Sequence, residues 1–206
     1  MKLGQETDTL DADGKVICEK EGFSFNREEI EAVLGRFRGR IQQTPPLYSA
    51  IKQGGLPLYK RVRSGERPKL MKRETMIHAL SLKEVSLPFV TLEVTCSRGT
   101  YIRSLCADIG QALGCGAHLV DLKRLRSGKF TTGQALSIDD LSQLVEQGKV
   151  EETIIPLKDS VDVSREIWMA QKTAARVRNG RPHCFSDLPE GNRGLIKNGH
   201  TTGPLD

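Results

Sequence analysis

The run of residues from Phe89 to Cys96 constrains the fold of this chain more than any other part of its sequence. Apolar and polar residues alternate along it, as in a strand with one buried face. An earlier strand, around residues 76–85, is expected to pair with it across Leu87-Pro88. A further short strand is predicted over residues 15–19, after an acidic turn. The sequence therefore predicts a sheet that contains a β-hairpin.

A helical pattern follows this strand directly. Apolar residues recur at helical spacing from Ile102 to Leu113, with Thr100 as the expected N-cap and Gly114 as the expected stop. Arg103 then lies in the first turn, where the positive end of the helix dipole disfavours a cation by about 0.3–1 kcal/mol. Residues that break a local rule often mark functional sites, so Arg103 is a candidate for binding a carboxylate or a phosphate. The alternative is a surface arginine whose head lies in water.

Two further helices are marked by capping signals. Asn26 and Glu29 form a capping box before a helix that is expected to end at Gly39. Ser137 is the expected N-cap of a later helix that runs to Gly148.

Composition and motifs exclude several classes of protein. The 206 residues contain no apolar run of membrane-spanning length, and the first residues show no signal-peptide core. We therefore expect a cytoplasmic protein with no membrane partner. The five cysteines form no CxxC pair and the four histidines show no ligand spacing, which predicts reduced thiols and no metal site. Asp8, Asp11 and Asp13 have a calcium-loop-like spacing, but the rest of that motif is missing.

Positive charge is concentrated in one part of the chain. Between Arg36 and Arg73 there are eleven Lys or Arg and one acid, whereas the first 31 residues hold nine acids and four bases. Residues 41–70 also contain four prolines and a Gly-Gly pair, which predicts a long irregular segment. A basic stretch of this kind favours a polyanion partner such as nucleic acid. The alternative is a solvated surface rich in lysine and arginine.

Aromatic and basic side chains extend the candidate nucleic-acid surface. Tyr48, Tyr59 and Tyr101 lie within or beside basic segments, and a tyrosine ring offers a face on which an unstacked base can rest. The alternative for each is a half-buried tyrosine with a hydrogen-bonded hydroxyl. His118 is expected to be a structural hydrogen-bonding residue. A second basic cluster, suited to phosphate contacts, comprises Lys123, Arg124 and Arg126.

Four blocks of the sequence resemble a known family. The blocks are LGQETDTLDADG at 3–14, FRGRIQQTPPLYSAIKQGGLPLY at 37–59, CSRGTYIRSLCADIG at 96–110 and LGCGAHLVDLKRLRSGKF at 113–130. Their order and spacing resemble the bacterial tRNA pseudouridine synthase B family over roughly the first 140 residues. Two small departures are Val62, where the family usually has a small residue, and Arg98, where a lysine is common.

The resemblance implies a fold and an activity. The implied fold class is α/β (α+β), with a mixed, mainly antiparallel pseudouridine-synthase sheet flanked by helices. The implied activity is that of a tRNA pseudouridine synthase, which isomerises uridine 55 in the T loop of tRNA with no cofactor. The base is flipped out of the loop, its glycosidic bond is broken, and it is rejoined through C5. The implied partner is the T stem-loop of tRNA, and we expect a monomer.

The same resemblance assigns the site residues. The arginine of the GTYIR block, Arg103, would pair with the nucleophilic aspartate of the family and keep it ionised. Tyr101 would contact the base. The expected RNA-binding residues are Tyr48, Lys52, Tyr59, Arg63, Arg98, Lys123, Arg124 and Arg126.

The family motif that carries the nucleophile, G-x-L-D-P, does not occur in the 206 residues. The family's active-site tyrosine, which precedes the LG-x-x-TDT block, is not found either. We therefore expect the chain to lack the first part of a synthase and to be inactive alone. Asp108 is not expected to replace the nucleophile, because positions i and i+5 of a helix do not meet. The alternatives are a noncatalytic tRNA-binding or RNA-folding protein and, less favoured, a nonfunctional remnant.

Two domains are predicted from these patterns. Residues 1–157 would form the synthase domain, incomplete at its N-terminus. Residues 158–206 would form a linker with a short helix over residues 171–178. This tail also resembles the start of the PUA-like module that many members of the family carry, which implies a partial PUA-like module. The division is placed where apolar residues become sparse, after Leu157.

Overall fold

The computed structural model describes residues 1–66, 68, 70–160, 165–169, 175, 176, 179 and 194–198. The chain divides into two compact units, Met1–Leu125 and Arg126–Asp206. The division predicted after residue 157 stays a prediction. The helix expected over residues 171–178 and the expected PUA-like module fall largely outside the described residues.

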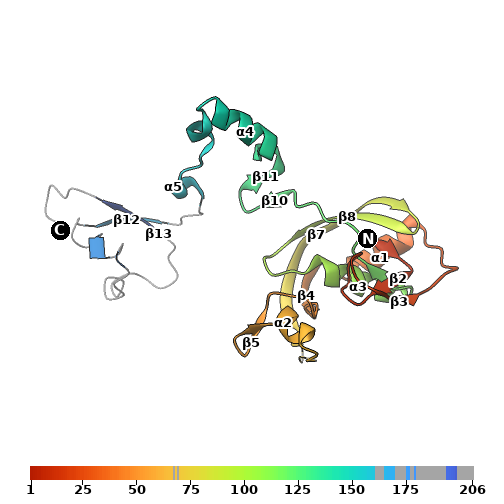
Figure 1. The fold of residues 1–206 in the computed structure, drawn as a ribbon. Coiled ribbons are helices and arrows are strands. Elements are labelled where there is room, and N and C mark those ends of the chain that lie inside the picture. Colours follow the sequence, from red (N-terminus) through yellow and green to blue (C-terminus); the bar gives the residue numbers. More distant parts are fainter. Residues whose placement is uncertain are drawn as a thin grey trace. The chain divides into compact units, whose positions relative to one another are not determined.

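The first unit is built on a five-stranded antiparallel sheet in the order β4-β7-β8-β1-β9. The predicted strand over residues 89–96 is confirmed at both ends, and so is its pairing across Leu87-Pro88. Figure 1 shows β7 and β8 as a long curved hairpin. The strands are β1 (Lys2–Leu3), β4 (Gly39–Gln43), β7 (Arg73–Ser86), β8 (Phe89–Cys96) and β9 (Ala117–His118).

Strand β7 contains two irregularities that keep its apolar side chains on the core face. The pairing register with β8 shifts between Ile77 and Ala79 and again after Leu82. A β-bulge adds one residue and so reverses the alternation of side chains. Ile77 is buried before the first shift, and Leu80 and Leu82 are buried after it. An unbroken alternation would have turned one of these groups toward solvent.

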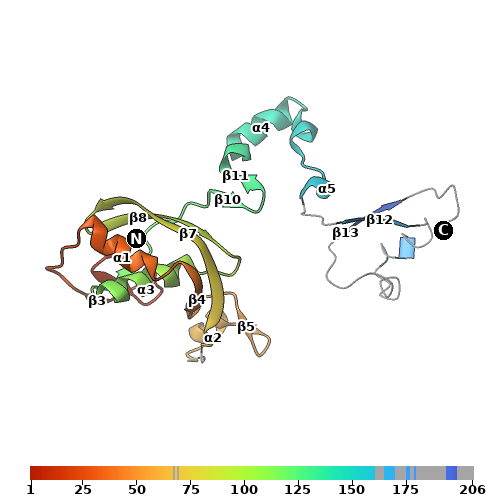
Figure 2. The ribbon, with the colours of Figure 1, turned by 180° about the vertical axis from the view of Figure 1, so that it is seen from behind.

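Helices α1 (Arg27–Gly35) and α3 (Ile102–Leu113) close the core of this unit. They contact each other, and they contact β7 and β9 respectively. Figure 2 shows the curved hairpin of β7 and β8 passing over both helices. Both helices and the sheet contribute to the buried core, which comprises Leu3, Ile30, Leu34, Ile77, Leu80, Leu82, Val90, Leu105, Ile109, Cys115 and Ala117.

The capping box of α1 is confirmed, because the Asn26 side chain accepts from the Glu29 N–H while the Glu29 carboxylate accepts from the Asn26 N–H. The helix ends at Gly35, however, and not at Gly39 as predicted. Gly39 has φ 85° and is the first residue of β4. Its left-handed backbone therefore begins the next strand after a short connection.

The start of α3 corrects one prediction and its end confirms another. The N-cap is Tyr101 and not Thr100, and no side chain makes the usual N-cap hydrogen bond. The Thr100 hydroxyl instead donates to the Ser97 carbonyl at 2.9 Å, inside the turn that precedes the helix. Gly114 ends the helix in the left-handed conformation at φ 76°, as predicted.

Residues 41–70 are less irregular than predicted, because local hydrogen bonds order short elements within them. These are the end of β4, then β5 (Lys52–Gln53), β6 (Leu56–Pro57) and α2 (Leu58–Arg63). The first unit also contains β2 (Gln5–Thr7), which pairs with β3 (Val16–Glu19) at the position predicted for a short strand.

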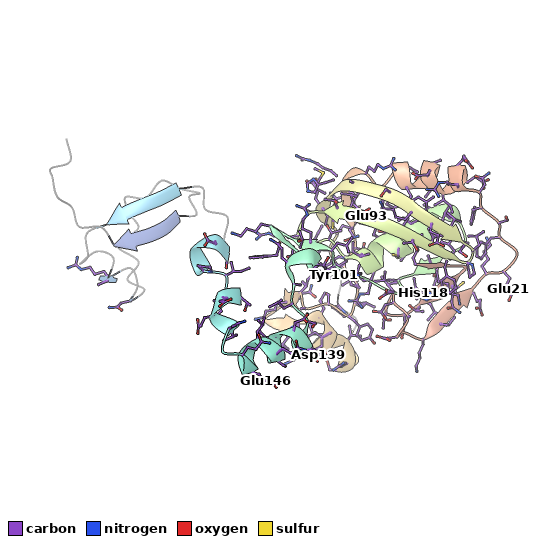
Figure 3. The ribbon with its side chains drawn as sticks, turned by 90° about the horizontal axis from the view of Figure 1, so that it is seen from above. Glu21, Glu93, Tyr101, His118, Asp139 and Glu146 are labelled. Carbon is purple, nitrogen blue, oxygen red and sulfur yellow. The ribbon has the colours of Figure 1, made fainter. Side chains whose placement is uncertain are left out.

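In the second unit, α4 (Ile138–Glu146) begins with the predicted Ser137 cap and ends two residues before the predicted stop at Gly148. None of its residues is buried, and Figure 3 labels Asp139 and Glu146 on it. The remaining elements are β10 (Arg126–Ser127), β11 (Phe130–Thr131), η1 (Thr132–Gln134), η2 (Val150–Thr153), α5 (Leu157–Ser160), and β12 (Arg165–Met169), which pairs in parallel with β13 (Gly194–Asn198).

Candidate functional site

The Arg103 guanidinium, in the first turn of α3, is held by acceptors from two other parts of the first unit. Nη1 donates to Asp11 Oδ2 at 2.8 Å and to the Thr9 carbonyl oxygen at 3.3 Å. Nη2 donates to the Tyr48 carbonyl oxygen at 2.9 Å. The side chains of Arg103 and Asp11 are each 25% exposed. Arg103 is therefore not a surface arginine with its head in water.

The acidic turn that supplies Asp11 is held in place by its own hydrogen bonds. The Thr9 hydroxyl donates to Asp11 Oδ1 at 2.6 Å, and the Asp13 N–H donates to the same oxygen at 3.2 Å. The buried Thr7 hydroxyl donates to the Asp11 carbonyl oxygen at 2.7 Å. Leu10 has φ 64°, a left-handed conformation that is strained for leucine. The strained residue therefore directly precedes Asp11, which pairs with Arg103.

The pKa of Asp11 lies below its ordinary value. Partial burial is the largest single influence and acts to raise the pKa. Hydrogen bonds from Thr9 and Arg103, the charge of the guanidinium and the Asp13 N–H together outweigh burial. Asp11 is therefore ionised at neutral pH, and its contact with Arg103 is a charge pair.

Tyr101 lies beside Arg103 and is fixed through its backbone. Its N–H donates to Gln43 Oε1 at 2.8 Å, and its carbonyl oxygen accepts from Gln43 Nε2 at 3.0 Å. One residue after Arg103, the Ser104 hydroxyl donates to the Thr44 carbonyl oxygen at 2.8 Å. The first turn of α3 is thus tied to the end of β4 and to the segment that follows it.

The structure brings some of the predicted site residues together and leaves others apart. Tyr101, Arg103 and the backbone of Tyr48 meet at the start of α3. Tyr59 and Arg63 form a separate group on α2, where the Arg63 guanidinium lies 5.7 Å from the centre of the Tyr59 ring. The remaining predicted cations are all exposed: Lys52 on β5, Arg98 in the turn before α3, Lys123 and Arg124 after β9, and Arg126 in the second unit.

His118 is buried, with 3% of its surface exposed, and its Nδ1 lies 2.9 Å from the Gln5 carbonyl oxygen. This agrees with the structural role predicted for it. Figure 3 labels His118 and Tyr101 among the side chains of the first unit. Asp108 is on α3 but is not among the contacts of Arg103, and partial burial raises its pKa against the opposing charge of Lys72.

Within the part of the chain that the structure describes, no three His, Cys, Asp or Glu side chains are grouped as metal ligands. Four described cysteines, Cys18, Cys96, Cys106 and Cys115, carry free thiols. Burial raises the pKa of the Cys106 thiol to about 11, so it is protonated and unreactive at neutral pH. Among the described helices, none combines the length and the apolar character needed to cross a membrane.

Two residues of the site were not identified from the sequence. The sequence patterns point to Asp11 only through a calcium-loop-like spacing, and they do not point to Gln43. A signal was nevertheless present, because Asp11, Gln43 and Arg103 each lie in a different one of the first three family-like blocks. The structure shows that these three blocks meet at the start of α3.

Comparison with known families shows which family the chain belongs to. Residues 1–102 match the family described as TruB family pseudouridylate synthase (N terminal domain), and residues 103–162 match the tRNA pseudouridylate synthase B C-terminal domain. The chain belongs to the TruB family. The antiparallel sheet with helices packed on it is the α+β fold expected for this family.

Curated relatives in the TruB family match nearly the whole chain. A protein of Geobacter sulfurreducens named tRNA pseudouridine synthase B is 37% identical over 189 residues. A protein of Xanthomonas axonopodis pv. citri with the same name is 42% identical over 190 residues. Each match covers 92% of this chain and 62% of the relative. The chain therefore spans about 62% of the length of these relatives.

Solved structures of related proteins show the same fold. A Cbf5-Nop10-Gar1 complex contains a chain that is 29% identical, with a TM-score of 0.59. That match covers 77% of this chain and 45% of the other. An archaeal box H/ACA sRNP Nop10-Cbf5 complex contains a chain that is 26% identical, with a TM-score of 0.56, and the match covers 77% of this chain and 44% of the other.

Proposed function

We propose that this chain carries the site arginine and the RNA-contacting surface of a tRNA pseudouridine synthase that acts on uridine 55 of the T loop. The proposal is supported by the name shared by the curated relatives, tRNA pseudouridine synthase B. It is also supported by the concentration of exposed cations and half-buried tyrosines in the segment that follows β4.

The observation that carries the proposal is the way in which Arg103 is held. A guanidinium has five N–H donors. The contacts with Thr9, Asp11 and Tyr48 use three of them. Two N–H groups are left for a further acceptor, which is the number that a carboxylate binds in a bidentate pair. We infer that Arg103 uses them to orient the nucleophilic aspartate of the family and keep it ionised.

In this reaction the aspartate attacks the nucleoside, the bond between N1 and C1′ breaks, and the uracil rejoins the ribose through C5. The hydrogen on C5 leaves as a proton and N1 gains one, so the isomerisation balances with no cofactor. The uridine must first leave the loop, which costs a few kcal/mol in unstacking. Tyr48, Tyr59 and Tyr101 are suited to stack on the displaced base, and the exposed cations are suited to contact phosphates.

The experiment uses T-arm RNA with tritium on C5 of uridine 55, because rejoining through C5 releases that label into water. The chain is assayed as printed and joined to an N-terminal segment that supplies the G-x-L-D-P motif of the family. We expect RNA binding by both proteins and tritium release only by the extended one.

In the extended protein, Arg103→Lys keeps a positive charge but loses the planar fork. We expect the rate to fall by about 100-fold, the scale of loss expected for a misplaced reacting group. An extended protein that binds the RNA tightly and releases no tritium would contradict the proposal and favour the noncatalytic RNA-binding alternative.

A further inference from the structure

The side-chain amide of Gln43, the last residue of β4, makes two hydrogen bonds to the backbone of one distant residue. Gln43 is 1% exposed. Its Oε1 accepts from the Tyr101 N–H at 2.8 Å, and its Nε2 donates to the Tyr101 carbonyl oxygen at 3.0 Å. The two residues are 58 positions apart in the chain. A buried amide that satisfies a backbone N–H and C=O together imitates one rung of a β-ladder.

This contact falls at a point where a helix normally needs support. The first N–H groups of an α-helix have no partner inside the helix. Tyr101 is the N-cap of α3, with φ −96° and ψ 107°, and no side chain caps the helix in the usual way. The Tyr101 carbonyl also accepts the first intrahelical bond, from the Leu105 N–H at 3.0 Å. Gln43 therefore fixes the backbone unit from which α3 starts.

The position of Arg103 depends on that starting point. Arg103 follows Tyr101 by two residues, and its guanidinium must lie between the acidic turn and the Tyr48 carbonyl to make its three contacts. Ser104 adds a second tie, to the Thr44 carbonyl oxygen. The tie from Gln43 makes two hydrogen bonds from a buried side chain, and its loss leaves the Tyr101 N–H without its acceptor.

We propose that Gln43 is a positioning residue of the synthase site: it sets the backbone at the start of α3 and thereby places the Arg103 guanidinium and the Tyr101 ring. The proposal rests on the proposed function insofar as Arg103 is the arginine of that site. It adds a buried residue that acts through the start of the helix.

The decisive experiment measures the position of Arg103 without any RNA. In Gln43→Met, which removes both hydrogen bonds at similar volume, the Asp11 carboxyl is titrated by NMR and the exchange rate of the Tyr101 amide proton is recorded. We expect the Tyr101 amide to exchange about tenfold faster, as for the loss of one hydrogen bond. We expect the pKa of Asp11 to rise toward its ordinary value, because the guanidinium beside it is displaced.

Two control variants separate positioning from general loss of stability. Gln42→Met changes the neighbouring glutamine, which is exposed on the same strand, and should leave both measurements unchanged. Ile30→Val removes one methyl group from the fully buried core of α1 and should lower stability while leaving the Asp11 titration unchanged.

A conservative variant keeps the inference testable if Gln43→Met does not fold. A protonated carboxyl can donate and accept as the amide does, whereas a carboxylate can only accept. Gln43→Glu should therefore keep both hydrogen bonds at acidic pH and lose the one to the Tyr101 carbonyl oxygen as the introduced carboxyl ionises, while the Tyr101 N–H keeps an acceptor. The NMR shift of the Tyr101 carbonyl carbon measures this change.

An Asp11 titration that is unchanged in Gln43→Met while the Tyr101 amide loses protection would overturn the inference. In the extended protein, the same variant should lower kcat for T-arm RNA by about 10- to 100-fold and leave KM unchanged. If the extended protein has no activity at all, the proposed function fails, and the titration still decides the role of Gln43.

Discussion

Arg103 lies at the end of α3 where the helix dipole disfavours a cation by about 0.3–1 kcal/mol. The structure shows how this cost is offset. Asp11 places a carboxylate 2.8 Å from the guanidinium, and the carbonyl oxygens of Thr9 and Tyr48 accept two more N–H groups. The helix end therefore faces a charge pair and not an isolated cation. Arg103 therefore connects α3 to the acidic turn at Thr9 and Asp11 and to Tyr48, which lies in the basic stretch between Arg36 and Arg73.

The lowered pKa of Asp11 predicts a pH dependence of stability. A carboxyl whose pKa is lower in the folded state stabilises the fold fully above its unfolded value, here 3.8, and loses that contribution as the pH falls through the folded value. Asp11→Asn removes the titrating group. We expect this variant to be less stable than the wild type at neutral pH and to lose less stability on acidification.

The measurement is urea unfolding at a series of pH values from neutral to strongly acidic. Asp8→Asn is a control in the same turn, because Asp8 accepts from the Lys15 N–H and is not among the contacts of Arg103. Parallel pH profiles for the wild type and Asp11→Asn would show that the pair with Arg103 does not stabilise the fold.

Among the elements, α1 and α3 show that the same substitution can have opposite effects in two helices. Gly110 lies within α3 where a Cβ would collide with the backbone of Gly116 and Ala117, so it allows the helix to approach β9 closely. Gly35 is the last residue of α1, and no atom lies within 4 Å of the place where its Cβ would be. Neither has a left-handed backbone.

We expect Gly110→Ala to lower the free energy of unfolding by about 1–3 kcal/mol, because the new methyl group overpacks a backbone contact. Gly35→Ala should raise it by roughly 0.5 kcal/mol, because alanine restricts the unfolded chain and favours the helix. Both changes are read from the midpoints of urea unfolding. Equal effects of the two variants would mean that α3 does not approach β9 as closely as the structure shows.

Backbone hydrogen bonds order the segment between β4 and β7. The Leu58 N–H donates to the Ile51 carbonyl at 2.8 Å, and the Tyr59 N–H donates to the Ser49 carbonyl at 3.2 Å. These bonds join the start of α2 to the residues that follow Tyr48. The stretch around Tyr48, whose carbonyl accepts from Arg103, is thus tied directly to α2, which carries Tyr59 and exposed cations.

For the whole molecule, the separation of charge predicts strongly salt-dependent RNA binding. Eleven Lys or Arg lie between Arg36 and Arg73, while acids dominate the first 31 residues. Each phosphate that a cation neutralises contributes roughly 0.7–0.9 to the slope of log K against log salt. We expect the double variant Lys52→Ala, Lys60→Ala, in which both lysines are exposed, to lower this slope by roughly 1.5.

The measurement is fluorescence anisotropy of labelled T-arm RNA over a range of salt concentrations. Lys83→Ala is the matched control, because this lysine is exposed on β7 but pairs with Glu93. It should leave the slope unchanged. An affinity that does not change with salt would mean that the basic segment does not contact phosphates.

Features set by neighbouring residues could be predicted from the sequence alone. The 89–96 strand, the capping box at Asn26, the N-cap at Ser137 and the stop at Gly114 follow from side-chain period and from hydrogen bonds within a few residues. The family blocks added the expectation that Arg103 is the site arginine. Its identity as a candidate came from its unfavourable place on a helix, which is also a local property.

Features that join distant residues were decided only by the tertiary structure. Arg103 and Asp11 are 92 residues apart, and Gln43 and Tyr101 are 58 apart. The bulges of β7, which keep Ile77 and Leu80 on one face, depend on pairing with β8. Thr100 was expected to cap α3, yet a side chain from β4 supports the helix start instead. A hydrogen bond between distant segments forms only where packing brings them together, and no local pattern encodes that distance.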